Sequence, residues 1–192
     1  MNKIQSLIEN TKIRSMRPDD FGLYHSLRSD SRIDHLMGSG QPWSETTHKR
    51  WFDGEIDVYD KVNMTIEYRG IPVGIVSLYN IEHIDHNCSL GVRILPEYIN
   101  KGVAEMACYY VLKIAFDRMN MRKVKASYID YNKASANVQK RNGFQLQGIF
   151  KDDDWVDGRY WDRIQMALFR EGFEKLKERF NKYKGGPNSG KP

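Results

Sequence analysis

The sequence predicts a single domain of the α+β (mixed α/β) class, with a central mixed sheet of six or seven strands flanked by helices. A strand at Cys88–Leu95, a striped helix starting at Val103 and a strand at Val124–Tyr128 form a βαβ unit, whose two strands are expected to be parallel. Alternating residues over Val62–Tyr79 predict one hairpin, and Asp157-Gly158 predicts the turn of another. The chain has 192 residues, of which 40% are hydrophobic, enough to bury a core without metal or disulfides.

Before the first hairpin, the residues predict one strand and two helices. The strand is expected at Ile13–Met16, after an N-terminal extension of residues 1–11. A helix is expected over 18–27, because a proline and two acids occupy its first turn. A loop at 38–42 then leads to a second helix over 44–56, which begins at a serine able to cap it.

After the βαβ unit, the pattern predicts a short helix at Ala134–Asn142, closed by Gly143, and a last strand at Arg159–Leu168. The domain is expected to span 12–173. The segment 174–192 is predicted to be the basic end of a helix followed by a disordered tail, since its last residues have linker composition. Most of the net charge of +5 lies in this terminal segment, which favours a solvated helix face over an anionic partner.

Composition narrows the class of function. Cys88 and Cys108 have no metal-ligand spacing and are expected to be small core residues in a reducing compartment. His83 and His86 have no third ligand at a suitable spacing, so no metal site is predicted. No apolar stretch approaches the roughly 20 residues of a membrane span, and no apolar run follows the charged N-terminus. We therefore expect a cytoplasmic protein with no membrane partner, and nucleic acid is not a favoured partner.

A short loop with one glycine joins the strand and the helix of the βαβ unit. Residues 99–104 place the unpaired N–H groups of a helix's first turn at the positive end of its dipole. Such a place binds anions, phosphate above all, and Lys101 adds a positive charge. Gly102 is expected to let the backbone come close to a ligand. A plain strand-to-helix connection is the alternative, because the loop is neither a P-loop nor a full GxGxxG fingerprint.

Two motifs at their proper separation resemble a known superfamily. PEYINKGVA (Pro96–Ala104) is similar to the pyrophosphate loop of the GCN5-related N-acetyltransferases (GNAT), and NKASANVQKRNGF (Asn132–Phe144) resembles their second cofactor motif. Tyr79–Tyr98 and Gly148–Phe173 are similar to segments of the RimJ/RimL/SpeG branch, which includes ribosomal-protein N-terminal acetyltransferases and a spermidine acetyltransferase. The resemblance covers about residues 12–173 and implies the GNAT fold, with acetyl-CoA as the acetyl donor.

The resemblance also implies where acetyl-CoA binds. The diphosphate is expected on the N–H groups of 99–104, the thioester carbonyl and pantetheine arm on the backbone of 91–94, and the 3′-phosphate near the second motif. Ile99 stands where the superfamily usually has Gln or Arg, so the backbone is expected to serve in place of a side chain. The implied cofactor-binding residues are Val92, Ile94, Asn100, Lys101, Gly102, Val103, Ala104, Asn132 and Arg141.

The implied reaction is direct attack of a primary amine on the thioester through a tetrahedral intermediate, with no acyl-enzyme. In the ribosomal-protein enzymes of this branch, a serine and an acidic residue have acid and base roles, and the matching residues are Ser135 and Asp154. Each has an alternative role: Ser135 as a helix cap or cofactor contact, and Asp154 as part of an acidic surface turn. Gln139, which cannot titrate, stands where many members have a tyrosine that protonates the leaving thiolate.

The acceptor is predicted to be a small-molecule or peptide amine: a peptide α-amine, an amino sugar or a polyamine, in that order. Nearby acids at 85 and 152–154 favour a cationic acceptor. Ser89, where the polyamine branch tends to have Glu, argues against a close copy of the spermidine enzyme. His86 is a further candidate base, and its alternative is an ordinary loop residue. Four tryptophans either flank the acceptor site or are buried in the core: Trp43, Trp51, Trp155 and Trp161.

Two hypotheses from other classes stay open. The same fold would serve as a non-catalytic acyl-CoA sensor or subunit, which Gln139 and Ile99 favour. The basic tail would serve a nucleic-acid binder, whose affinity falls steeply with salt. A homo-oligomer is also compatible with the plentiful apolar and aromatic residues.

Overall fold

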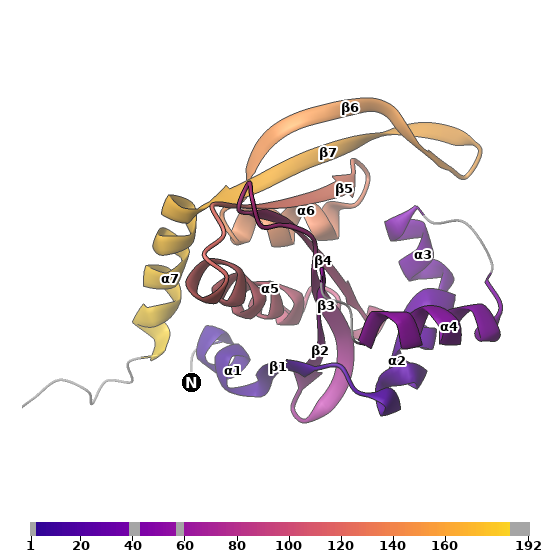
Figure 1. Cartoon of the computed structure of the whole chain (residues 1–192), viewed down its shortest axis with the longest axis horizontal. Helices are drawn as coiled ribbons and strands as arrows, with labels where there is room; N and C mark the ends of the chain where they lie inside the picture. Colours follow the sequence, from indigo (N-terminus) through magenta and orange to yellow (C-terminus); the bar gives the residue numbers. More distant parts are fainter. Residues whose placement is uncertain (1–2, 39–42, 57–59, 185–192) are drawn as a thin grey trace, which may run out of the picture.

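A computed structural model of the chain describes residues 3–38, 43–56 and 60–184. A seven-stranded sheet in the order β1-β2-β3-β4-β5-β7-β6 forms its centre (Figure 1). Neighbouring strands are antiparallel, except that β4 and β5 are parallel, as the predicted βαβ unit requires. The strands are β1 (Thr11–Ser15), β2 (Val62–Tyr68), β3 (Ile71–Glu82), β4 (Asn87–Ile94), β5 (Lys123–Ile129), β6 (Gln145–Val156) and β7 (Arg159–Phe169). The predicted fold class and both hairpins are confirmed.

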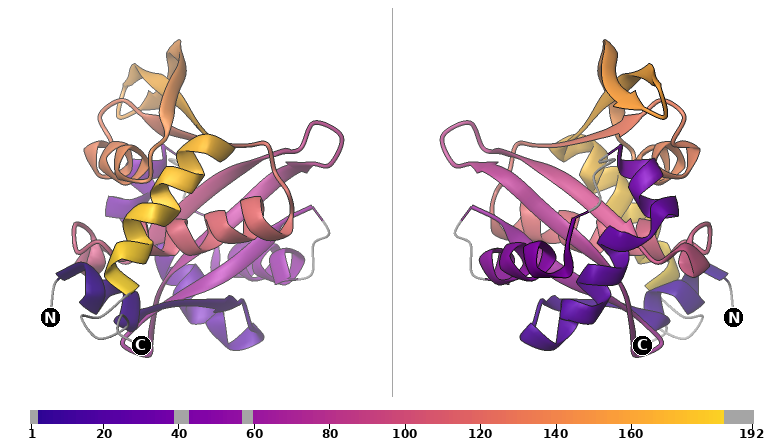
Figure 2. Two further views of the ribbon diagram at one scale, coloured as in Figure 1. Left: turned by 90° about the vertical axis from the view of Figure 1, so that its left-hand side faces the viewer. Right: turned by 90° about the vertical axis from the view of Figure 1, so that its right-hand side faces the viewer.

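Helices cover both faces of the sheet (Figures 1 and 2). α1, α5 and α7 lie on one face, α2, α3 and α4 lie on the other, and α6 contacts α5 and β5. The helices are α1 (Lys3–Asn10), α2 (Phe21–Ser29), α3 (Ser31–Met37), α4 (Glu45–Ile56), α5 (Val103–Lys113), α6 (Lys133–Arg141) and α7 (Arg170–Lys184). Short 3₁₀ turns at Pro18–Asp20 and Pro96–Tyr98 precede α2 and α5, and a π-helical turn at Ile114–Arg118 extends α5. Within the described residues, no helix combines the length and apolar character that a membrane span requires.

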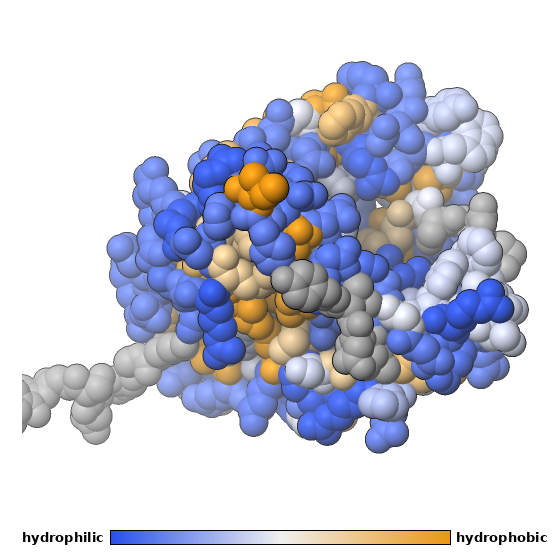
Figure 3. Space-filling model, viewed as in Figure 1, coloured by the Kyte–Doolittle hydropathy of each residue, from blue (hydrophilic) through white to orange (hydrophobic). Residues whose placement is uncertain are grey.

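The main core lies between α5 and the sheet. Val103, Ala107 and Val111 are spaced four residues apart and therefore lie on one face of α5. All three are fully buried in the core that α5 forms with the sheet. Cys88 of β4 and Cys108 of α5 are buried there, as predicted. The outer surface in Figure 3 is largely hydrophilic, with hydrophobic side chains showing around α1 and α5.

Both ends of the chain pack on this core. Within the predicted N-terminal extension, α1 places Ile4, Leu7 and Ile8 against the core. The predicted domain end at residue 173 falls inside α7, whose apolar face is buried. Its buried residues are Phe173, Leu176 and Phe180. Lys175 and Lys182 of α7 are exposed, and the predicted tail beyond 184 lies outside the described residues.

A buried carboxylate in the 3₁₀ turn before α2 ties that turn to β1 and β2. Asp20 is 4% exposed and receives two hydrogen bonds from the Arg14 guanidinium, at 2.7 and 2.8 Å. Thr65 Oγ1 and the Arg17 N–H also donate to it, each at 2.8 Å. Burial alone would raise the pKa of Asp20, but these hydrogen bonds outweigh it and hold the pKa below its ordinary value.

The helix α3 is a further addition to the predicted elements. Asp30 caps it by accepting a hydrogen bond from the Arg32 N–H at 2.9 Å, and Gly38 ends it in the left-handed region at φ 70°. Most of the predicted loop at 38–42 lies outside the described residues. α4 follows as predicted, with Ser44 Oγ accepting from the Thr47 N–H at 3.2 Å.

Candidate active site

The parallel strands β4 and β5 lie side by side at one end only. Their pairing is limited to three residue pairs, from Asn87–Lys123 to Ser89–Lys125. β4 continues to Ile94 and β5 to Ile129 without further pairing between them, while each keeps its antiparallel neighbour. The backbone groups on these facing edges therefore form no ladder, and they are available to a ligand.

A cleft of about 310 Å³ opens at this separation, between β4, the start of α5 and α6. Seven of the nine residues predicted to bind acetyl-CoA line it: Val92, Ile94, Asn100, Gly102, Ala104, Asn132 and Arg141. The other two do not. Val103 is buried in the core, and Lys101 is exposed, with its Nζ 5.1 Å from the ring centre of Tyr98.

The loop before α5 presents unpaired N–H groups to the cleft. α5 begins after Gly102 with no side-chain cap, and its first helical bond is Met106 N–H to Gly102 C=O at 3.1 Å. Within the described residues, the N–H groups of 103–105 have no acceptor. Together with the helix dipole, they form an anion site of the predicted kind.

Gly102 lines the cofactor cleft and also has a packing role that was not predicted. Its φ is 90°, a left-handed conformation that favours glycine. A Cβ at this position would lie 2.7 Å from Leu7 Cδ1 of α1. The missing side chain therefore makes room for α1.

One acid, Glu105, lines the cofactor cleft and is shared by two arginines. Its carboxylate lies 3.6 Å from Arg141 Nη1 of α6 and 3.0 Å from Arg179 Nη2 of α7. Arg141 is 61% exposed at the side chain, so its guanidinium is accessible to an anionic group at the mouth of the cleft.

A second cavity, of about 480 Å³, joins the cofactor cleft and is here called the acceptor cavity. It lies among α2, α3, the ends of β2–β5, α6 and β7. The two cavities share part of their lining, including Val92, Arg93, Asn132, Ser135 and Val138. A group bound in one cavity therefore reaches a group bound in the other beside β4.

Ser135 stands at this junction, and its neighbours fix its role. Asn132 caps α6 by accepting from the Ser135 N–H at 3.0 Å, so Ser135 itself does not cap the helix. Buried Gln139 donates from Nε2 to Ser135 Oγ at 3.2 Å. Because the hydroxyl oxygen accepts this bond, the hydroxyl proton is left to point to another partner.

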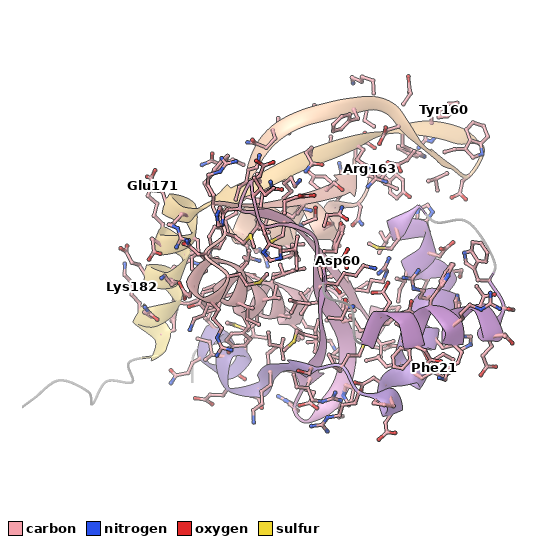
Figure 4. The ribbon with its side chains drawn as sticks, viewed as in Figure 1. Phe21, Asp60, Tyr160, Arg163, Glu171 and Lys182 are labelled. Atoms are coloured by element: carbon pink, nitrogen blue, oxygen red, sulfur yellow. The ribbon has the colours of Figure 1, made fainter. Side chains whose placement is uncertain are left out.

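The structure does not bring Asp154 together with Ser135. The Asp154 carboxylate is ion-paired with Arg163 Nη2 on the neighbouring strand, its side chain is 11% exposed, and it lines neither cavity. Arg163 does line the acceptor cavity, and it extends from β7 toward the body of the domain (Figure 4). Its Nη1 also donates to Ser127 Oγ at 3.2 Å. Arg163 therefore stands between Asp154, the predicted base, and the acceptor cavity.

Other candidates from the sequence lie outside the two cavities. His83 and His86 lie at the turn between β3 and β4, and no histidine lines either cavity within the described residues. None of the four tryptophans is fully buried or lines either cavity, but Trp51 packs partly buried against a small core cluster and lies against Arg28 of the acceptor cavity. The acids at 85 and 152–154 do not line the acceptor cavity either. The argument from these acids for a cationic acceptor therefore fails.

Several residues of the acceptor cavity were not predicted. Glu55 accepts from Lys61 Nζ at 3.1 Å and from Asn63 Nδ2 at 2.9 Å. Arg28 and Arg93 complete the charged lining. One signal was present in the sequence: Arg93 is the only charged residue within the strand segment 88–95.

Neither cysteine is a candidate nucleophile. Burial raises the pKa of both Cys88 and Cys108 to about 12. Because the thiolate is the nucleophilic form, both residues serve the core, as predicted.

Comparison with known proteins decides the family. Residues 10–145 match the family model of the acetyltransferase (GNAT) domain. The chain belongs to the GNAT acetyltransferase family. This confirms the predicted enzyme class, an acetyl-CoA-dependent acetyltransferase, with acetyl-CoA as its co-substrate.

Individual GNAT relatives are distant. The chain is 22% identical to spermidine N(1)-acetyltransferase of Escherichia coli over 171 residues, which cover 85% of this chain and 88% of that enzyme. It is 30% identical to the uncharacterized N-acetyltransferase YnaD of Bacillus subtilis, covering 83% and 93% of the two chains. The structure of spermidine N-acetyltransferase from Vibrio cholerae with CoA and spermine superposes with a TM-score of 0.80 at 18% identity, covering 86% of this chain and 99% of that one.

The residues present fit acetyl-CoA. The unpaired N–H groups of 103–105 suit a diphosphate, and the unladdered edge of β4 suits an extended arm with amide groups. The cofactor cleft and the acceptor cavity run together at Ser135, where the thioester end would meet an acceptor.

Proposed function

We propose that this GNAT enzyme transfers the acetyl group of acetyl-CoA to a primary amine bound in the acceptor cavity. The observation that carries the proposal is that the two cavities meet where β4 and β5 separate. An anion site lies at the far end of one cavity, and a polar chamber forms the other. This arrangement suits a donor and an acceptor that meet beside one strand.

The chain's own groups would hold the donor. The N–H groups of 103–105 bind the diphosphate, and the Arg141 guanidinium binds a further phosphate at the mouth of the cleft. Backbone groups of 91–94 bind the pantetheine arm. Acetyl-CoA supplies the thioester carbonyl that the amine attacks.

Ser135 is the proposed general acid for the departing sulfur. Its oxygen is held by Gln139, so its proton is directed into the junction of the two cavities. Gln139 replaces a titratable group with a fixed donor and positions the serine.

Asp154 is retained in the proposal as a positioning residue. Its carboxylate holds Arg163 against the acceptor cavity, and the proton of the attacking amine passes through water in that cavity to Ser135, which replaces the proton given to the departing sulfur. This differs from the base role that the family resemblance implied, because no described contact places the carboxylate on the acceptor.

The acceptor classes carried forward are a peptide α-amine, an amino sugar and a polyamine. A relative named as a spermidine acetyltransferase supports the last. Two relatives with ribosomal names support the first: a putative ribosomal N-acetyltransferase of Bacillus subtilis, and an enzyme for alanine of ribosomal protein uS5 in Escherichia coli.

Free thiol release tests the proposal. Purified protein is incubated with acetyl-CoA and, separately, an alanine-starting peptide, glucosamine and spermidine. Ser135→Ala should lower kcat by about 10²-fold with CoA affinity retained, because a general acid typically contributes at least that factor. Ser26→Ala is the matched control, since Ser26 is exposed on α2 and bonds only to the Gly22 carbonyl, at 2.9 Å.

Each outcome has a distinct meaning. Release with one acceptor, lost only in Ser135→Ala, supports the enzyme and its acid. Release that survives the substitution removes Ser135 from the chemistry. Tight CoA binding without release, for every acceptor, favours the sensor or subunit hypothesis.

A further inference from the structure

The charges of the acceptor cavity are unequal. Among the described residues, its lining holds one acid, Glu55, and four basic side chains. Glu55 is paired with Lys61 at 3.1 Å, and Arg163 is paired with Asp153 at 3.2 Å and with its neighbour Asp154. Two arginines, 28 and 93, form no ion pair within the described residues, although the negative charge of Glu55 also acts on Arg93.

Arg93 is placed at the reaction junction. It lies on β4 directly after Val92 and lines both the cofactor cleft and the acceptor cavity. Its guanidinium makes no hydrogen bond or ion pair with any described residue. Burial lowers the pKa of Arg93, and the nearby positive charge of Arg28 lowers it further.

Arg28 faces the same space from α2. Its guanidinium carbon lies 5.0 Å from the ring centre of Tyr24 and 5.2 Å from that of Trp51, so two aromatic rings hold it in place. Its Nε is buried and has no hydrogen-bond partner. Because ring contacts use the face of the guanidinium, they leave its N–H donors available to a ligand.

Two neighbouring cations with unused donors are unfavourable in a partly buried site unless an anion joins them. Resting on the proposed function, we infer that the acceptor is an amine that also carries an anionic group, a carboxylate or a phosphate, which Arg28 and Arg93 bind. The amine then faces the junction with the cofactor cleft. Arginine is suited to this task because its planar fork matches both oxyanions.

The inference separates this chain from enzymes for polycations. Among the described residues, a polyamine entering the acceptor cavity would meet two guanidinium groups that form no ion pair and a single acid that is already engaged. We therefore expect spermidine to be a poor acceptor, although a relative of this chain is named for it.

Matched acceptor pairs test the inference. Alanyl-aspartate amide is compared with alanyl-asparagine amide, and glucosamine 6-phosphate with glucosamine, with spermidine as the cationic reference. We expect kcat/KM to be at least tenfold higher for the anionic member of one pair. The pair that responds distinguishes a carboxylate from a phosphate.

Charge variants identify the groups responsible. Arg93→Gln and Arg28→Gln should bring the anionic-to-neutral ratio of kcat/KM close to one, and Arg93→Lys should restore part of it. Arg118→Gln should keep the full ratio, because Arg118 is an exposed arginine outside both cavities. A higher kcat/KM for the neutral members or for spermidine would overturn the inference.

A readout without turnover separates this inference from the proposed function. With the protein saturated with CoA, sulfate should raise the Tm of the parent and of Arg118→Gln by more than it raises the Tm of Arg93→Gln or Arg28→Gln, because sulfate also stabilises folded proteins without a specific site. If no acceptor releases thiol while CoA still binds, the proposed function fails and the sulfate response alone judges the anion site. A sulfate response that is absent in the parent, or unchanged in both variants, refutes the site.

Discussion

Replacing Gly102 by alanine tests whether this glycine serves the fold or the ligand. Alanine at φ 90° costs about 1–2 kcal/mol as a left-handed residue. Its Cβ would lie 2.7 Å from Leu7 Cδ1, so Leu7 or α1 must move, at about 1–2 kcal/mol for overpacking. We expect a loss of about 2–4 kcal/mol in the free energy of unfolding and a fall in Tm of roughly 5–15 °C for a chain of this size.

Leu7→Ala separates the two parts of this cost. In that background the clash disappears, so Gly102→Ala should cost only the backbone part, about 1–2 kcal/mol. Urea denaturation gives the four free energies, and calorimetry gives the CoA affinity of each protein. Equal costs in both backgrounds would refute the packing argument. Unchanged stability with weakened CoA binding would instead indicate that Gly102 serves ligand binding.

Three further changes have defined outcomes. Asp20→Asn should cost about 1–3 kcal/mol in urea denaturation, because it weakens the buried hydrogen bonds that Asp20 accepts, while Arg14 keeps its ion pair with Glu67 at 2.7 Å. Since the pKa of Asp20 is lowered in the fold, its contribution is present above about pH 4 and lost as the pH falls through its folded pKa; a pH series should show this acid loss in the parent and little of it in the variant. Asp154→Asn should lower kcat/KM without shifting the pH profile, and a lost acidic limb, the rise of kcat/KM with pH, would instead identify it as the base. Gln139→Leu should lower kcat by roughly fivefold with CoA affinity kept, as one hydrogen bond to Ser135 is lost, and an unchanged kcat would contradict that role.

Periodic patterns and turn residues were sufficient to predict the sheet and its parallel pair. The strong signals were the apolar stripe of α5, the Asp157-Gly158 turn and the alternation from Val62 to Tyr79. α1 and α3 were missed because they are short, with eight and seven residues, and their apolar faces gain meaning only against the core. The spacing of Ile4, Leu7 and Ile8 was the available signal for α1.

In the candidate site too, features that are local in the sequence were predicted, and features that depend on packing were not. Family motifs located the cofactor cleft and Ser135, since loop and helix are local in the sequence. The proximity of Arg28 and Arg93 in one cavity was not predictable from one sequence. The two residues are far apart in the chain, and only the packing of α2 on the sheet brings them together. Asp154 was identified as a residue, but its contact with Arg163 depends on the register of β6 and β7.

The C-terminal helix has a consequence for truncation experiments on its basic segment. Phe173 stacks on Phe116 and Phe180 on Tyr109, with ring centres 4.7 and 4.2 Å apart. A chain cut after residue 173 would therefore expose part of the core. It would also free Glu105 from its bond to α7 and leave it to neutralise Arg141 alone. Weakened phosphate binding in such a truncated chain would then report the loss of the contacts that α7 makes with the core and with Glu105, and not the loss of a basic tail.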